Sequence, residues 1–143
     1  MPYKYIEDEV TADIAFIAWG IDLPTLFKGA GDALMNAMVE NPDTIRLLEE
    51  RIIEISHEQL DLLLYNLLDH IIFYKDKETL LLRLVDIFIE RSNAGWRLCA
   101  KGKGERLDAS RHHPIIDVKA VTLHDLRVEP SDAGWQAHVV LDV

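Results

Sequence analysis

The spacing of apolar residues changes near residue 80, and this change limits the folds that the chain can adopt. Before it, two stretches carry apolar residues three and four positions apart, which predicts amphipathic helices over about 23–39 and 58–74. Beyond residue 80, runs rich in Leu, Ile and Val are separated by turn residues, a pattern typical of paired strands. Helices followed by successive hairpins favour the α+β class.

Each predicted helix follows a predicted strand. Residues 14–19 alternate between two faces and end at Gly20, and residues 45–55 form the second strand. Asp22 is suited to cap the first helix, because its side chain can accept a hydrogen bond from the first turn. The leucine-rich stripe of the second helix is predicted to be a core face rather than a leucine zipper.

Two hairpins are predicted in the second half of the chain. Residues 80–90 and 96–101 form the first, and residues 119–129 and 135–142 form the second. A glycine-containing polar loop over 102–117 joins them. We therefore expect a single domain over 1–143, in which two helices pack on one face of a mainly antiparallel β-sheet.

The charge of the chain bears on its partners. With 25 acidic and 15 basic residues, the formal net charge is −10. Stable binding to nucleic acid depends on basic residues that neutralise phosphates, so direct RNA or DNA binding is not expected. A basic protein partner is favoured, because opposite charge speeds encounter.

Cysteine content and hydropathy bear on location. The single cysteine, Cys99, excludes an internal disulfide framework and a zinc site built from several thiolates. No apolar run approaches the roughly 20 residues of a membrane span. The amino terminus lacks the apolar region of a signal peptide. A cytoplasmic protein with no membrane association is therefore expected.

Two aspartates near opposite ends of the chain indicate a metal site. Asp13 precedes the strand at 14–19, and Asp142 closes the last strand. If these strands pair, both carboxylates converge with the terminal carboxylate of Val143. Three oxygen anions suit a hard divalent cation such as Ca²⁺, Mg²⁺ or Mn²⁺. The spacing alone also allows Asp13 and Asp142 merely to end strands in water.

Motifs of known enzymes are not found in the sequence. It contains no phosphate-binding loop, no dinucleotide fingerprint after a strand and no nucleophile elbow. His112 and His113 are expected in a surface loop, because adjacent residues on a strand would point to opposite faces. His124 is expected to be partly buried and hydrogen-bonded, since it shares strand parity with apolar residues.

Four segments, taken together and in order, resemble the archease family over nearly the whole chain. They correspond to an amino-terminal motif, a central loop, a characteristic strand and the carboxyl terminus of that family. The matching residues are Tyr5-Ile6-Glu7 with Thr11-Ala12-Asp13; Gly104-Glu105, Asp108 and Arg111-His112; Val118-Lys119-Ala120-Val121-Thr122 with His124; and Trp135-Gln136-Ala137 through Val140-Leu141-Asp142-Val143.

The chain departs from the family pattern at two positions. Val10 stands where the amino-terminal motif usually carries histidine, next to the predicted metal aspartate, so the tuning of that site differs here. Leu123 replaces an aromatic residue that is common in the characteristic strand, which we interpret as a packing change.

The resemblance implies a protein cofactor that is not itself an enzyme. Archeases assist the RtcB-type tRNA-splicing ligase, which joins RNA ends bearing a 2′,3′-cyclic phosphate or 3′-phosphate to a 5′-hydroxyl. They promote guanylylation of the ligase and allow multiple turnover. The family's metal site maps onto Asp13, Asp142 and Val143 of this chain.

Two other classes of function stay open on the sequence. The first is a general acidic chaperone or adaptor for basic client proteins. The second is a small hydrolase or nuclease that uses the metal directly, although the acidic composition and the lack of a base–nucleophile arrangement argue against it.

Overall fold

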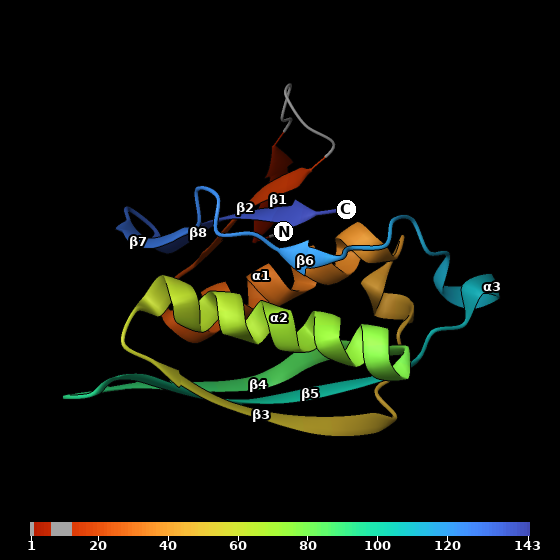
Figure 1. The fold of residues 1–143 in the computed structure, drawn as a ribbon, viewed down its shortest axis with the longest axis horizontal. Helices are drawn as coiled ribbons and strands as arrows, with labels where there is room; N and C mark the ends of the chain where they lie inside the picture. The colour runs from red at the N-terminus through yellow and green to blue at the C-terminus, as the bar shows by residue number, and fades with distance from the viewer. Residues whose placement is uncertain (1, 7–12) are drawn as a thin grey trace.

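The computed structural model describes residues 2–6 and 13–143 and arranges them as two antiparallel sheets with the long helices between them (Figure 1). In chain order the elements are β1 (Tyr3–Ile6), β2 (Ile14–Gly20), α1 (Leu23–Met38), a 3-10 turn η1 (Pro42–Thr44), β3 (Glu49–His57), α2 (Leu60–Glu78), β4 (Leu80–Ser92), β5 (Gly95–Arg106), α3 (Ala109–His112), β6 (Ala120–Val121), β7 (Arg127–Ser131) and β8 (Gly134–Asp142).

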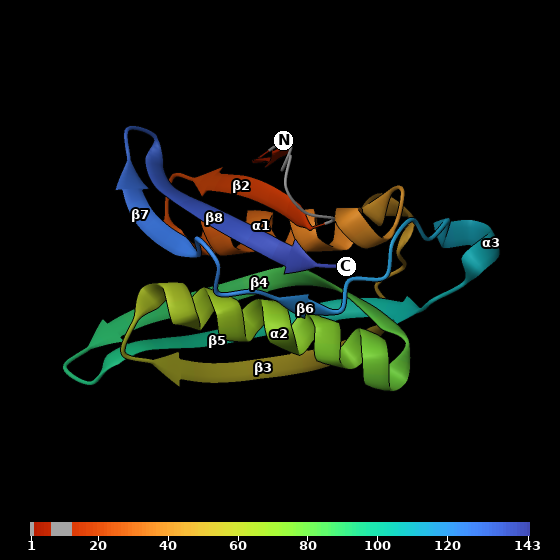
Figure 2. The ribbon, with the colours of Figure 1, turned by 45° about the horizontal axis from the view of Figure 1, so that its top comes forward.

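The first sheet joins the two ends of the chain. Its strands run in the order β1-β2-β8-β6, and β7 also pairs with β8. Along the β2–β8 ladder, Ile14 faces Leu141 and Gly20 faces Trp135. β7 pairs with the beginning of β8 and β6 with its end, beside the carboxyl terminus (Figure 2). The central position of β8 places the last residues of the chain next to the start of β2.

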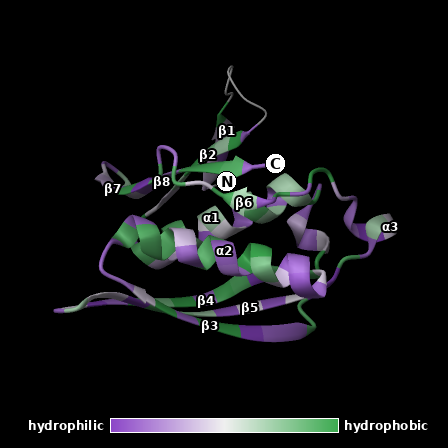
Figure 3. Cartoon of the chain, in the orientation of Figure 1, coloured by the Kyte–Doolittle hydropathy of each residue, from purple (hydrophilic) through white to green (hydrophobic). Residues whose placement is uncertain are grey.

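The second sheet has the strand order β3-β5-β4, and both long helices cover one of its faces (Figure 1). Apolar and polar residues are mixed along its three strands, as expected for strands with one buried face (Figure 3). The predicted α+β class and the placing of two helices on one face of an antiparallel sheet are confirmed. The sequence analysis did not foresee that β1, β2, β6, β7 and β8 form a separate sheet.

Helix α1 lies between the two sheets, and its small residues explain why it can. A Cβ added at Gly31 would lie 2.7 Å from Cδ1 of Leu84 in β4. A Cβ added at Gly29 would lie 3.2 Å from Cγ of Pro2, which precedes β1. The two glycines therefore face different sheets and let both approach the helix closely. The predicted N-cap is confirmed, because the Thr25 N–H donates to Oδ1 of Asp22 at 2.9 Å.

Helix α2 supplies one wall of the hydrophobic core. Its apolar stripe is fully or almost fully buried, as predicted for a core face. The helix ends where Thr79 adopts a left-handed conformation with φ of 52°. The buried residues of the stripe are Leu63, Leu64, Leu67, Leu68, Ile71 and Ile72.

Two strand predictions need correction. The loop predicted from residue 102 is strand up to Arg106, because Gly104 lets β4 approach: a Cβ there would lie 1.6 Å from the carbonyl oxygen of Leu81. The strand predicted over 119–129 is interrupted between β6 and β7, where Asp125 has a φ of 50°. His124 lies in this turn and is exposed, not partly buried. Strand β1 was not predicted.

Candidate functional site

The β2–β8 ladder brings the two predicted metal aspartates to one level of the first sheet. Its last pair joins Ile14 and Leu141. Asp13 immediately precedes the first of these residues, and Asp142 immediately follows the second. The pairing of the two strands on which the metal prediction depended is therefore present.

Strand β6 completes this end of the sheet. The backbone N–H of Lys119 donates to the carbonyl oxygen of Asp142 at 2.8 Å, and Ala120 lies opposite Asp142. Val143 follows directly and packs, partly buried, against the core. The backbone around Asp142 is thus fixed on both sides, which holds the chain end beside Asp13.

The donor groups at this end suit a hard cation. Asp13 is half-buried and Asp142 is exposed. The structure gives the carboxylate of Asp142 no hydrogen bond or ion pair with residues 2–6 or 13–143. Carboxylate oxygens are the ligands that a divalent ion such as Ca²⁺ prefers. The residue types at this end are therefore of the kind that the predicted cation prefers.

No cluster of metal-ligating side chains is present in the described part of the chain, either at the chain ends or elsewhere. Among residues 2–6 and 13–143, no group of three or more His, Cys, Asp or Glu side chains is placed to hold an ion. Nor is any helix of those residues long and apolar enough to cross a membrane. Val10 and Thr11, which belong to the amino-terminal motif, lie outside the described residues.

A second polar site, around Glu105 at the end of β5, was not predicted from residue spacing. Arg111 forms a bidentate pair with the Glu105 carboxylate, and its Nη1 lies 2.7 Å from Oε2. The backbone N–H of Arg46 donates to the same oxygen at 2.6 Å. The Arg111 guanidinium, opposed in part by burial, holds the pKa of Glu105 at about 2. The carboxylate is therefore charged and fully paired inside the protein.

His112 completes this network and is entirely buried, contrary to the expected surface loop. The backbone N–H of Asp108 donates to Nδ1 at 2.8 Å, so that nitrogen carries no proton. Nε2 must then carry it and donate to Glu105 at 3.1 Å. The short helix α3 allows this arrangement, because its first turn is capped by Asp108 and turns His112 inward. Only tertiary structure reveals this contact, since Glu105 and His112 share no strand or helix.

The chain matches one known protein family over nearly its whole length. Residues 3–143 match the model of the "Archease protein family (MTH1598/TM1083)". The chain is 37% identical over 136 residues to protein archease of Pyrococcus abyssi, covering 94% of this chain and 95% of that protein. It is 33% identical over 143 residues to protein archease of Archaeoglobus fulgidus, covering all of both chains.

Solved structures agree with this match. The solution structure of protein 1598 from Methanobacterium thermoautotrophicum superposes with a TM-score of 0.85 at 30% identity and covers 99% of both chains. The crystal structure of an archease, "possible chaperone", from Thermotoga maritima gives a TM-score of 0.55 at 17% identity, covering 98% of this chain and 96% of that one, and shows the fold alone. Sequence and fold give the same answer: the chain belongs to the archease family.

Proposed function

We propose that this protein activates an RtcB-type RNA ligase in tRNA splicing and RNA repair without catalysing a reaction itself. In this proposal it promotes guanylylation of the ligase and multiple turnover through a divalent metal held at the chain ends. The proposed location is the cytoplasm, with the ligase as the protein partner. Membership of the archease family supports the choice of partner.

The observation that carries the proposal is the register of β2 against β8. It places Asp13 and Asp142 at one level of the sheet, directly beside Val143. Asp13 and Asp142 would supply side-chain oxygens, and Val143 would supply its carbonyl or terminal carboxylate. Ca²⁺ is the proposed ion, with Mg²⁺ or Mn²⁺ as alternatives of similar ligand preference.

The chemistry of guanylylation explains why such a site would help a ligase. When bound, a divalent ion neutralises negative charge on a transferring nucleotidyl group and on the leaving pyrophosphate. The residues of this chain would position that charge: the β2–β8 ladder fixes Asp13 and Asp142, and the hydrogen bond from Lys119 fixes the backbone between Asp142 and Val143. An alternative within the proposal is a structural ion that ties the two chain ends together.

RNA ligation with substrate in excess tests the proposal. A matched RtcB-type ligase should make well over one product per enzyme only when the protein is present. Asp13→Ala and Asp142→Ala should abolish the stimulation, whereas Asp132→Ala, in the distant turn between β7 and β8, should preserve it. Full stimulation by both metal-site variants would remove the metal from the mechanism. A ligase indifferent to the unaltered protein would refute the proposed function.

A tag on the chain end tests the part of Val143. An extension fused directly after Val143 removes the terminal carboxylate and should weaken Ca²⁺ binding, whereas an amino-terminal tag should not. Equal Ca²⁺ affinity of the two tagged proteins would leave only the carbonyl of Val143 as a ligand.

The second candidate function is a general chaperone for basic clients, favoured by the net charge of −10 and by the "possible chaperone" description of the Thermotoga protein. A chaperone of this kind would suppress aggregation of unrelated basic proteins, and Asp13→Ala would not affect it. Ligase stimulation that requires Asp13 would exclude this explanation. RNA cleavage by the isolated protein, lost in Asp13→Ala, would instead point to a nuclease.

A further inference from the structure

The segment from His113 to Lys119, which we call the strap, is exposed except at the buried Val118, and hydrogen bonds hold it to the rest of the protein. Its Ile115 N–H donates to the carbonyl oxygen of Met38 at 2.8 Å. Near its other end, Nζ of Lys75 donates to the carbonyl oxygen of Val118 at 2.9 Å. These bonds tie the strap to the ends of α1 and α2. A segment fixed in this way presents its side chains with little further loss of entropy on binding.

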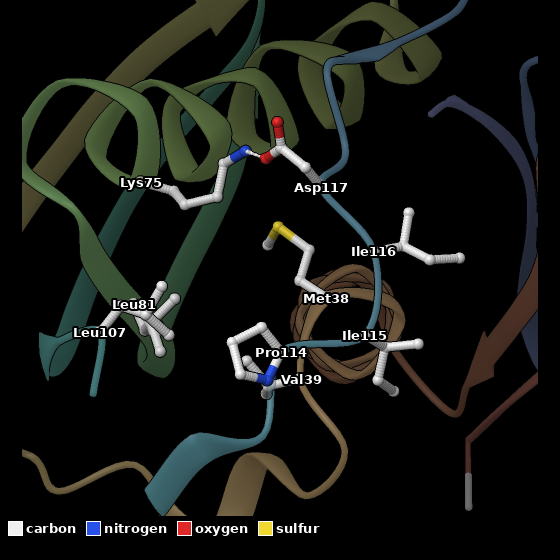
Figure 4. A pocket seen from close by; sticks show the side chains of 9 residues that line it. All are labelled: Met38, Val39, Lys75, Leu81, Leu107, Pro114, Ile115, Ile116 and Asp117. Atoms are coloured by element: carbon white, nitrogen blue, oxygen red, sulfur yellow. Dashed lines mark hydrogen bonds and ion pairs between the residues drawn. The ribbon is translucent and has the colours of Figure 1, made fainter. Parts of the chain in front are cut away.

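Between the strap, the end of α1 and strand β4 lies a pocket of about 320 Å³ (Figure 4). Its lining is mainly apolar and includes the buried side chains of Met38 and Leu81. At its mouth, Ile115 is 55% exposed and Leu107 is 40% exposed. Exposed apolar side chains around an apolar pocket are typical of a surface that binds another protein.

Two carboxylates share one ammonium group at the edge of the pocket, and one of them, Asp117, lines it. Nζ of Lys75, which lines the pocket, is paired with the carboxylate of Asp117 (Figure 4). The same Nζ is paired with Oδ1 of Asp76 at 2.8 Å, although Asp76 itself does not line the pocket. The two carboxylates outnumber the single ammonium group. The side chain of Asp117 is 76% exposed, so it can accept a further hydrogen bond from outside. The rim therefore favours a cationic group next to an apolar one.

We propose that this pocket receives an apolar side chain of a basic protein partner, and that a neighbouring Lys or Arg of that partner pairs with Asp117. The inference rests on the proposed function, since the partner is the RtcB-type ligase proposed above. A second copy of this chain is disfavoured because it too carries a charge of −10. A small anionic ligand is disfavoured because the ammonium of Lys75 is already neutralised.

The pocket and the metal site would face the partner together. Asp117 is two residues before Lys119, whose N–H binds the carbonyl oxygen of Asp142. The strap therefore runs from the pocket directly to the chain ends. A partner that inserts a side chain into the pocket would therefore also contact the segment that leads to Asp142.

Two exposed isoleucines provide a matched test. Ile115→Glu places a charge at the pocket mouth, and Ile52→Glu places the same charge on the outer face of β3, where the native side chain is 49% exposed. The affinity for an RtcB-type ligase is measured by titration of the labelled protein. Ile115→Glu should weaken binding by about 30-fold, the loss typical of a central interface residue. Ile52→Glu should stay within about twofold of the unaltered chain.

Two exposed aspartates test the charge. Asp117 and Asp43 each pair with a basic side chain and are 76% and 85% exposed. Asp117→Asn should weaken binding by roughly fivefold and lower its salt dependence, whereas Asp43→Asn should change neither. Thermal unfolding monitors the fold of each variant, and Leu107→Glu replaces Ile115→Glu if the latter unfolds.

The possible outcomes distinguish failure of the docking pocket from failure of the proposed function. If the unaltered chain binds the ligase and Ile115→Glu binds equally well, the pocket is not the docking site and the proposed function stands. Equal losses in Ile115→Glu and Ile52→Glu would also overturn the pocket, because a charge anywhere on the surface would have the same effect. No binding by the unaltered chain would overturn the proposed function and this inference together.

Discussion

Two carboxylates of this protein, Glu105 and Asp142, have opposite surroundings. Glu105 is almost completely buried and accepts hydrogen bonds from Arg111, His112 and the backbone of Arg46. Asp142 is exposed, and its carboxylate accepts no hydrogen bond from the part of the chain that the structure describes. Glu105 is paired with basic side chains of the protein, and we interpret it as a structural carboxylate. Asp142 lacks such partners among the described residues, and its oxygens are the kind of ligand that a divalent ion prefers.

The Glu105 network and the chain end around Asp142 are connected through the strap. The Glu105 network anchors α3, and the strap that follows α3 ends at the hydrogen bond between Lys119 and Asp142. The buried network therefore positions the segment that carries the docking pocket and supports the chain ends. Stability and the proposed binding function are divided between two acidic sites that the strap connects.

The largest predicted effect is the loss of the buried carboxylate. Glu105→Ala should lower the free energy of unfolding by about 3 kcal/mol, because it removes the acceptor of Arg111 Nη2, of the Arg46 backbone N–H and of the buried Nε2–H of His112. Urea unfolding followed by circular dichroism at neutral pH measures this change.

The matched control for this prediction is Asp142→Ala in the absence of divalent ions. That variant should change the free energy of unfolding by no more than about 0.5 kcal/mol, as is usual for an exposed residue. Equal destabilisation by Glu105→Ala and Asp142→Ala would break the distinction between a structural and a binding carboxylate.

Calcium should make Asp142 nearly as important for stability as Glu105. At a free Ca²⁺ concentration about 100 times the dissociation constant, the free energy of unfolding should rise by about 2.7 kcal/mol. Asp142→Asn should remove this gain, whereas Asp132→Asn, at the opposite end of β8, should retain it. Thermal unfolding with and without Ca²⁺ measures both. A gain of the same size in the two variants would show that Asp142 is not a ligand of the ion.

Acid should act mainly through Glu105. Its pKa falls from an ordinary value of 4.5 to about 2 in the folded protein, so the unfolded chain binds more protons between these values. The stability that this group contributes is complete above pH 4.5 and is lost as the pH falls through about 2. We expect a loss of about 3 kcal/mol from this group over that range.

Glu105→Gln isolates this contribution, because the amide does not titrate. The free energy of unfolding of this variant should fall less steeply below pH 4.5 than that of the unaltered protein. Parallel curves for the two proteins would show that other carboxyl groups dominate the acid response.

Much of the architecture followed from local sequence signals. Alternation and helical spacing located β2, both long helices and the β4–β5 hairpin, because these patterns record which face of each element is buried. The cap at Asp22 was equally local. The positions of Asp13 and Asp142 beside two apolar strands also indicated the candidate site, provided that those strands paired.

What the sequence by itself determined is the two long helices, the strand before each of them, the β4–β5 hairpin and the acidic residues at the chain ends. Only the tertiary structure decided which strands share a sheet, that α1 is packed on both sides, and that Glu105 meets His112. Strand pairing and buried polar contacts join residues that are distant in sequence or lie in different elements. The energies that select them arise from packing and desolvation in the folded molecule, which no local pattern records.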